Sequence, residues 1–209
     1  MKKLLILTLA AVLSVPAMAD NPLKGDIIVD AALGVGSVAH AGDDARAQFT
    51  QRASVEWCVT DKLFGKPEMA LGIGLAFNNQ FGGTVHWGKF SSATRDDISF
   101  VPTATLHYDL TDRIDTYGAV GVGIAVMNHS SAVAYSDEFP GGIYADEGLF
   151  CHTSGRSSAA FAMSLYAGMR YYFTDSWAVE AQVGLINAAI KKSYGNSYNF
   201  LTIGAAYSF

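Results

Sequence analysis

A histidine and a serine stand at a spacing that supports hydrolytic chemistry. His129 and Ser131 are two positions apart, and Asp137 and Glu138 follow a few residues later. A histidine can activate a serine hydroxyl as a nucleophile when a third group orients its ring, and such a pair hydrolyses esters and amides. Three further histidines lie in polar segments, where we expect them to be solvated: His40, His86 and His152. No zinc-binding or phosphate-binding pattern is found elsewhere, so the sequence predicts no metal and no cofactor.

The elements that would position these residues are β-strands. From Tyr198 to Phe209, apolar residues alternate with mostly small or polar ones. A period of two indicates a strand with two unlike faces. Seven earlier segments repeat the pattern, at about 26–36, 48–60, 68–77, 98–109, 117–126, 161–173 and 177–185.

The connections between these segments alternate between long and short. We expect loops at 40–47, 78–96, 128–157 and 187–196, with tight turns between the other pairs. An even number of alternating strands of roughly ten residues is typical of transmembrane barrels. The predicted fold class is all-β: an eight-stranded antiparallel up-and-down transmembrane β-barrel.

Composition agrees with an exported membrane protein. The chain of 209 residues is 50% hydrophobic and 16% charged, yet it lacks the run of about 20 apolar residues that a transmembrane helix needs. The longest apolar run, Leu4 to Val15, follows two lysines and precedes Ala17-x-Ala19. This is typical of a signal peptide, predicted at 1–19, with the barrel domain at 20–209. The net charge of −5 gives no basic patch, so we expect no nucleic-acid partner.

Charged residues avoid the apolar faces of the predicted strands. An arginine or lysine facing lipid near mid-membrane costs about 2–4 kcal/mol, which explains the segregation. We expect five inward charges to form a buried ion-pair cluster: Asp30, Arg52, Glu56, Arg170 and Glu180. The cluster is interpreted either as a structural plug or as part of a gated ion path. Pro102 has no N–H for a closed sheet, and it suggests a local bulge.

Aromatic residues gather on the apolar faces at the turn ends of the strands. Amphipathic rings at this depth form an interfacial girdle. The predicted girdle comprises Trp57, Tyr108, Tyr171, Phe173, Trp177, Tyr207 and Phe209. A soluble barrel with apolar faces inward would instead expose the glycines and alanines of the opposite faces, which argues against that alternative.

Two stretches resemble a known family in their literal residues. GMRYYFTDSWAVEAQVG, residues 168–184, and YDLTDRIDTYG, residues 108–118, are similar to opacity-type and OmpA-type (OmpX-like) eight-stranded outer-membrane barrels. The resemblance implies location in the cell outer membrane, contact with its lipid and lipopolysaccharide, and a monomeric state. It also implies that barrel-assembly machinery reads the aromatic carboxyl end. The peptidoglycan-binding domain of full-length OmpA-type proteins is not expected after Phe209.

The resemblance also bears on the histidine–serine pair. Outer-membrane lipid A deacylases are eight-stranded too, and their His-x-Ser pair faces lipid. Here the pair continues the inward parity of Tyr117 and Gly121, and the asparagine that follows their serine is Ala132. We therefore expect no enzyme, with a lipid A-modifying hydrolase as a remote alternative.

The predicted function is structural and surface-interacting. An eight-stranded barrel is just filled by its own side chains, so we expect no wide pore, and a narrow channel for small solutes or ions is the alternative. Function concentrates in loops on rigid scaffolds, which points to an extracellular ligand or host surface. Candidate contacts in the predicted loops are Phe81, Trp87, Phe90, Tyr135, Phe139 and Tyr144, unless they pack on one another.

The two cysteines are predicted to lie at opposite ends of the barrel. Cys58 is inward and close to a short turn, whereas Cys151 falls in the third long loop. The apolar band of such a barrel is about 25 Å tall, and a disulfide needs Cα atoms within about 7 Å. We therefore expect no intramolecular disulfide.

Overall fold

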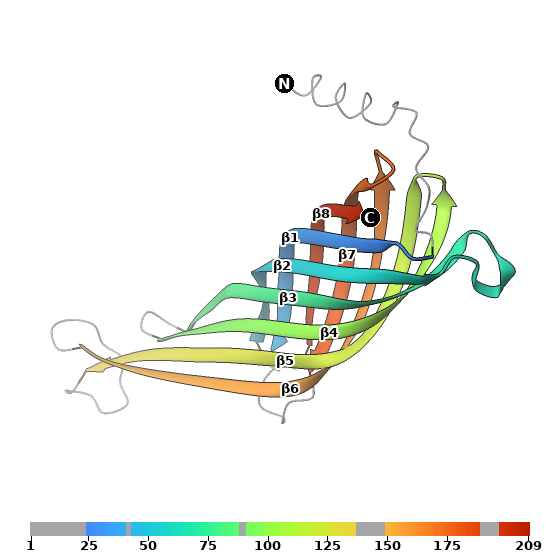
Figure 1. Cartoon of the computed structure of the whole chain (residues 1–209). Coiled ribbons are helices and arrows are strands. Elements are labelled where there is room, and N and C mark those ends of the chain that lie inside the picture. The colour runs from blue at the N-terminus through green and yellow to red at the C-terminus, as the bar shows by residue number, and fades with distance from the viewer. Residues whose placement is uncertain (1–23, 41–42, 88–90, 137–148, 189–196) are drawn as a thin grey trace, which may run out of the picture.

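The computed structural model describes residues 24–40, 43–87, 91–136, 149–188 and 197–209. The predicted signal peptide, residues 1–19, lies outside this part of the chain. Eight strands form one closed barrel in which each pairs with its sequence neighbours and β1 pairs with β8 (Figure 1). The strands are β1 Ile27–His40, β2 Asp43–Thr60, β3 Met69–Trp87, β4 Ser91–Thr111, β5 Ile114–Ser136, β6 Leu149–Tyr172, β7 Trp177–Ala188 and β8 Ser197–Ser208.

All pairings are antiparallel, so the predicted fold class is confirmed. The carboxyl-terminal strand closes the barrel, with Val29 opposite Tyr207 and Val35 opposite Leu201. Within the described residues, no helix is long and apolar enough to cross a bilayer.

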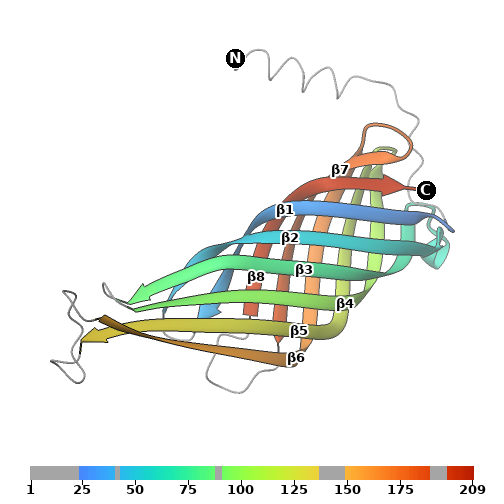
Figure 2. The same ribbon diagram turned by 60° about the vertical axis from the view of Figure 1, so that its left-hand side comes forward.

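The predicted loops at 78–96 and 128–157 are wrong. The β3–β4 ladder continues to the pair Trp87–Ser91, and the β5–β6 ladder continues to Ser136–Leu149. Likewise, β1 reaches His40 and β2 begins at Asp43, within the loop expected at 40–47. The period-two pattern requires lipid on one side and lumen on the other. Beyond the bilayer this asymmetry vanishes, but backbone pairing continues, and Figure 2 shows β5 and β6 projecting past the rest of the barrel.

The two faces of the strands follow the predicted parity. Outward residues such as Leu33, Val120, Leu165 and Ile203 are exposed, between 56% and 68%. The alternate positions are buried and often polar. The apolar faces therefore point away from the lumen, as a bilayer requires and as a soluble barrel would not.

The expected bulge at Pro102 is also wrong. The β4–β5 ladder pairs Phe100 with Ile124 and then Thr103 with Gly121, in one unchanged register. The rungs at Val101 and Pro102 are missing from this ladder, while Pro102 still opposes Leu75 on β3. Because proline has no N–H, the backbone pairing toward β5 is interrupted here, and no extra residue is inserted.

Candidate functional site

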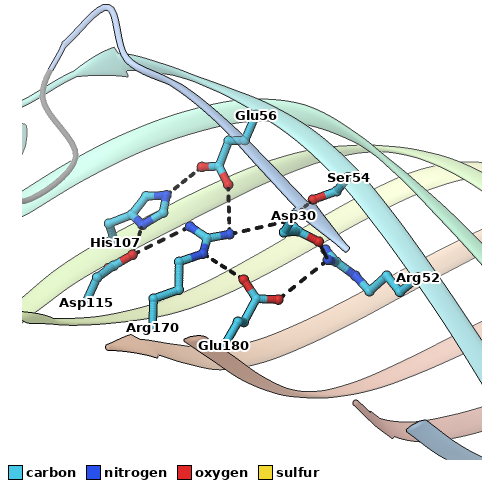
Figure 3. A network of polar contacts seen from close by, with 8 residues as sticks. All are labelled: Asp30, Arg52, Ser54, Glu56, His107, Asp115, Arg170 and Glu180. Atoms are coloured by element: carbon cyan, nitrogen blue, oxygen red, sulfur yellow. Dashed lines mark hydrogen bonds and ion pairs between the residues drawn. The ribbon is translucent and has the colours of Figure 1, made fainter. Parts of the chain in front are cut away.

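A buried cluster of charged side chains fills the lumen near its short-turn end (Figure 3). Arg170 on β6 lies at its centre, with Nε donating to Glu180 Oε2 at 2.7 Å. Its two Nη atoms lie 3.6–3.7 Å from carboxylate oxygens of Asp30, Glu56 and Asp115. A single guanidinium therefore contacts four carboxylates.

Arg52 on β2 forms the second cationic centre of the cluster. It is ion-paired with Asp30 and lies 3.7 Å from Glu180 Oε1. The hydroxyl of Ser54 also donates to Asp30. The structure thus brings together all five charges that the sequence placed inward: Asp30, Arg52, Glu56, Arg170 and Glu180.

Register and small residues explain why these side chains meet. Arg170 lies directly opposite Glu180 on β7 and opposite Asp115 on β5. On β3, Gly72 has no side chain, and the Glu56 carboxylate occupies the space where its Cβ would be. Glu56 can therefore cross from β2 over β3 toward β4.

Sequence reasoning missed His107 and Asp115 as members of the cluster. His107 Nδ1 lies 2.9 Å from Asp115 Oδ2, and Nε2 lies 2.5 Å from Glu56 Oε1. Both new residues are fully buried. Ionised carboxylates only accept hydrogen bonds, so an imidazole between two of them donates from both nitrogens and carries a positive charge. The inward parity of His107 was visible in the sequence, but its neighbours across β3 were not.

The charges of the cluster nearly balance. Four carboxylates face two guanidinium groups and one imidazolium, which leaves one net negative charge among these groups. Buried charges are tolerated when they are paired and hydrogen-bonded, and removing one partner is strongly destabilising. Each charged side chain of the cluster is therefore tolerated in the lumen only while its partners are present.

Aromatic and apolar side chains seal the cluster along the barrel axis. The Arg170 guanidinium lies 4.4 Å from the ring centre of Tyr117, and that of Arg52 lies 5.4 Å from that of Tyr166. Toward the short-turn end of the lumen, a buried apolar layer follows, formed by Ile28, Cys58, Tyr172, Ala178 and Ala206. The described lumen is thus occupied by side chains at this level.

The residues of the expected girdle lie on the outer surface. Trp57, Tyr108, Trp177 and Phe209 are exposed, and Tyr171, Phe173 and Tyr207 are partly exposed. The rings of Trp177 and Tyr207 lie 4.8 Å apart, and those of Tyr207 and Phe209 lie 4.6 Å apart. These rings form a continuous aromatic contact around the carboxyl terminus.

The candidate surface contacts are only partly described. Phe81 belongs to β3 and packs edge-on against Phe49, with ring centres 5.1 Å apart. Trp87 and Tyr135 belong to β3 and β5, but their side chains lie outside the described part. Phe90, Phe139 and Tyr144 lie outside the described residues altogether.

The histidine–serine pair lies on β5, not in a loop. His129 and Ser131 oppose Arg156 and Ser154 of β6. The side chains of the pair, together with Asp137 and Glu138, lie outside the part that the structure describes.

The cysteines give a direct test of topology. Cys58 is a fully buried free thiol two residues from the short-turn end of β2. Cys151 is on β6 rather than in a loop, opposite Ala134 and 21 residues before the short-turn end at Tyr172.

Treating intact cells with a membrane-impermeant maleimide should label Cys151 and spare Cys58. Labelling of Cys58 alone, or an intramolecular disulfide on non-reducing gels, would contradict this topology.

Comparison with known proteins shows which family model and which solved structures this barrel resembles. The family model described as "Outer membrane protein beta-barrel domain" matches residues 5–209. A search of curated proteins returned no match. The attachment invasion locus protein Ail of Yersinia pestis is similar in structure, with a TM-score of 0.57 and 13% identity over 90% of this chain and 100% of that one.

Two further solved structures are similar. Neisserial surface protein A has a TM-score of 0.58 and 13% identity over 89% of this chain and 100% of that one. The outer membrane protein OprG of Pseudomonas aeruginosa has a TM-score of 0.51 and 12% identity over 93% of this chain and 99% of that one. At these identities the likeness is one of fold.

Proposed function

Because this chain belongs to the outer membrane protein beta-barrel domain family, we propose that it is a surface-interaction scaffold whose barrel is closed by the buried ion cluster. The barrel anchors the chain in the outer membrane, and its elongated outer hairpins carry the contact surface. The observation that most strongly supports these two roles is that side chains fill the lumen, while the hairpins extend far beyond the bilayer.

The hairpins are much longer than membrane crossing requires. Strands β4, β5 and β6 contain 21, 23 and 24 residues, whereas about 9–11 residues span a bilayer. At about 3.3 Å per residue, the excess length of each strand is on the order of 40 Å. Backbone pairing makes these extensions ribbons rather than loose loops. Such a ribbon can present residues well above the membrane surface.

The expected partners follow from this division of roles. Outer-membrane lipid and lipopolysaccharide would contact the outward faces, and an extracellular ligand or host surface would contact the hairpins. The name of Ail assigns attachment to that protein, which supports the same class of role here by analogy. A monomer suffices, because one chain already closes the barrel.

Trimming one hairpin tests the proposal. The deletion of residues 130–155, with Asn-Gly joining His129 to Arg156 across their rung, should leave a hairpin closed by a type I′ turn. In a non-adherent bacterial host, cells with the full chain should adhere to cultured epithelial monolayers several-fold more than cells with the trimmed chain. Asp112→Asn, in the opposite short turn, controls for expression. Equal adherence at equal surface level would contradict the proposal.

A second prediction concerns assembly. The Phe209 N–H donates to the Ile27 carbonyl at 3.0 Å, so the last residue still belongs to the β8–β1 seam. If assembly machinery reads this aromatic end, deleting Phe209 should lower the outer-membrane level several-fold. Phe209→Tyr, which keeps the ring, should restore it. An undiminished level of the deletion in isolated outer membranes would count against this reading.

A further inference from the structure

We propose that Glu56, Cys58 and His107 form a binding site for one divalent ion of the zinc class at the short-turn end of the lumen. One carboxylate oxygen, the thiol sulfur and one ring nitrogen all lie within 4.8 Å of one another, and all three residues are buried. This site lies at the edge of the ion cluster, and it is independent of the proposed surface role.

The three side chains can meet because β3, the strand between β2 and β4, carries a glycine at this level. Glu56 and Cys58 are two residues apart on β2, so both point inward. His107 points inward from β4, and β3 lies between the two strands. At the level of the site, β3 contributes Gly72, which pairs with Cys58 on one side and Thr105 on the other. Because Gly72 has no Cβ, side chains from β2 and β4 meet directly.

The donor set suits zinc. Zinc binds thiolate sulfur, imidazole nitrogen and carboxylate oxygen at about 2.0–2.3 Å, usually in tetrahedral geometry. Those bond lengths imply donor separations of roughly 3.3–3.8 Å. A pair as far apart as 4.8 Å would therefore close by about 1 Å, and the 2.5 Å pair of His107 Nε2 and Glu56 Oε1 would open by about the same amount. Rotation of the Glu56 and Cys58 side chains supplies such a movement.

His107 is already oriented as a metal-ligating histidine. Its Nδ1 donates to Asp115 Oδ2 at 2.9 Å, and its Nε2 faces Glu56 Oε1 at 2.5 Å. Metal-ligating histidines typically donate their second N–H to a carboxylate, which fixes the ring and raises its basicity. The ion would take the place of the proton between His107 and Glu56.

Cys58 supplies the independent observation. It is fully buried and forms no disulfide within the described residues. Its neighbours in the apolar layer include Ala178 and Ala206, so the layer itself calls for a small apolar side chain and not for a thiol. Unlike an apolar side chain, a thiol at this position can lose its proton and ligate a metal.

Proton release keeps the charge of the cluster constant. The incoming ion brings two positive charges, while His107 loses its Nε2 proton and Cys58 loses its thiol proton. Two protons leave for each ion bound, and no bond to carbon changes. Metal binding therefore adds no net charge to the lumen, and its affinity should rise with pH.

Cobalt serves as the spectroscopic probe. The mature chain with Cys151→Ser, whose only thiol is Cys58, is refolded into detergent micelles with Co²⁺. We expect one Co²⁺ per barrel, tetrahedral d–d absorption and a near-ultraviolet sulfur-to-cobalt charge-transfer band. Added Zn²⁺ should bleach both signals and release Co²⁺. Folding is verified by the altered gel mobility of the unheated sample.

Two variants complete the test. Adding Cys58→Ala should abolish the charge-transfer band, and His107→Gln should weaken Co²⁺ binding at least tenfold. The folded Cys151→Ser protein decides the matter even if these variants fail to fold. A folded Cys151→Ser barrel without the charge-transfer band would overturn the proposal, as would the same band in a folded protein that also carries Cys58→Ala.

Discussion

Replacing Arg170 by methionine should destabilise the barrel by about 3–5 kcal/mol, because it removes one partner from a buried network of ion pairs. Arg170 is fully buried and contacts four carboxylates. Without it, Arg52 and His107 remain as the cations of the cluster, and Glu180 loses its 2.7 Å donor. Urea unfolding in micelles, followed by tryptophan fluorescence, measures the change.

A paired variant separates lost charge balance from lost packing. In Arg170→Met with Glu180→Met, one charge of each sign leaves, so the double variant should be more stable than Arg170→Met alone. A cost below about 1 kcal/mol for the single variant, which is typical of exposed pairs, would mean that water reaches the cluster.

Val122→Arg should cost about 2–4 kcal/mol and reduce insertion into bilayers, because it places a charge on the lipid face. Val122 on β5 is 47% exposed and lies within the apolar outer surface. Leu110→Arg is the matched control. Leu110 is 60% exposed on the same kind of face, next to the end of β4, where an arginine should cost about 0–1 kcal/mol.

Folding yield into vesicles, read from gel mobility, compares the two variants. Gly121→Ser is unsuitable as an inward control, because a Cβ on Gly121 would lie 2.5 Å from Val101 Cγ1. If Val122→Arg and Leu110→Arg insert equally well, then the position of the bilayer on β4 and β5 is wrong.

The fold was predictable from the sequence because lipid imposes a strict rule on every second residue. Leu201, Ile203 and Val120 could only be outward, and Arg52 and Glu180 only inward, if a bilayer surrounds the chain. That rule ends at the membrane surface. Residues 78–87 and 128–136 lack the alternation, yet they continue β3 and β5 through backbone pairing with the neighbouring strands. Sequence parity cannot detect such strands.

The cluster was predictable as a set of inward charges but not as a geometry. Parity places His107 on the inner face, whereas its contacts depend on the register of three strands and on the absent side chain of Gly72. Asp115 was missed because it is the second residue of β5, directly after a tight turn, where a polar residue is expected anyway. Its pairing with Arg170 depends on the β5–β6 register.

The closed lumen is the central claim, and single-channel recording in planar bilayers tests it most directly. Refolded wild-type protein, with insertion verified by protease protection, should give no steady conductance. Arg170, Arg52 and their carboxylate partners would have to separate before hydrated ions could pass. A steady conductance on the nanosiemens scale from the wild-type protein would contradict a plugged barrel and favour the narrow channel.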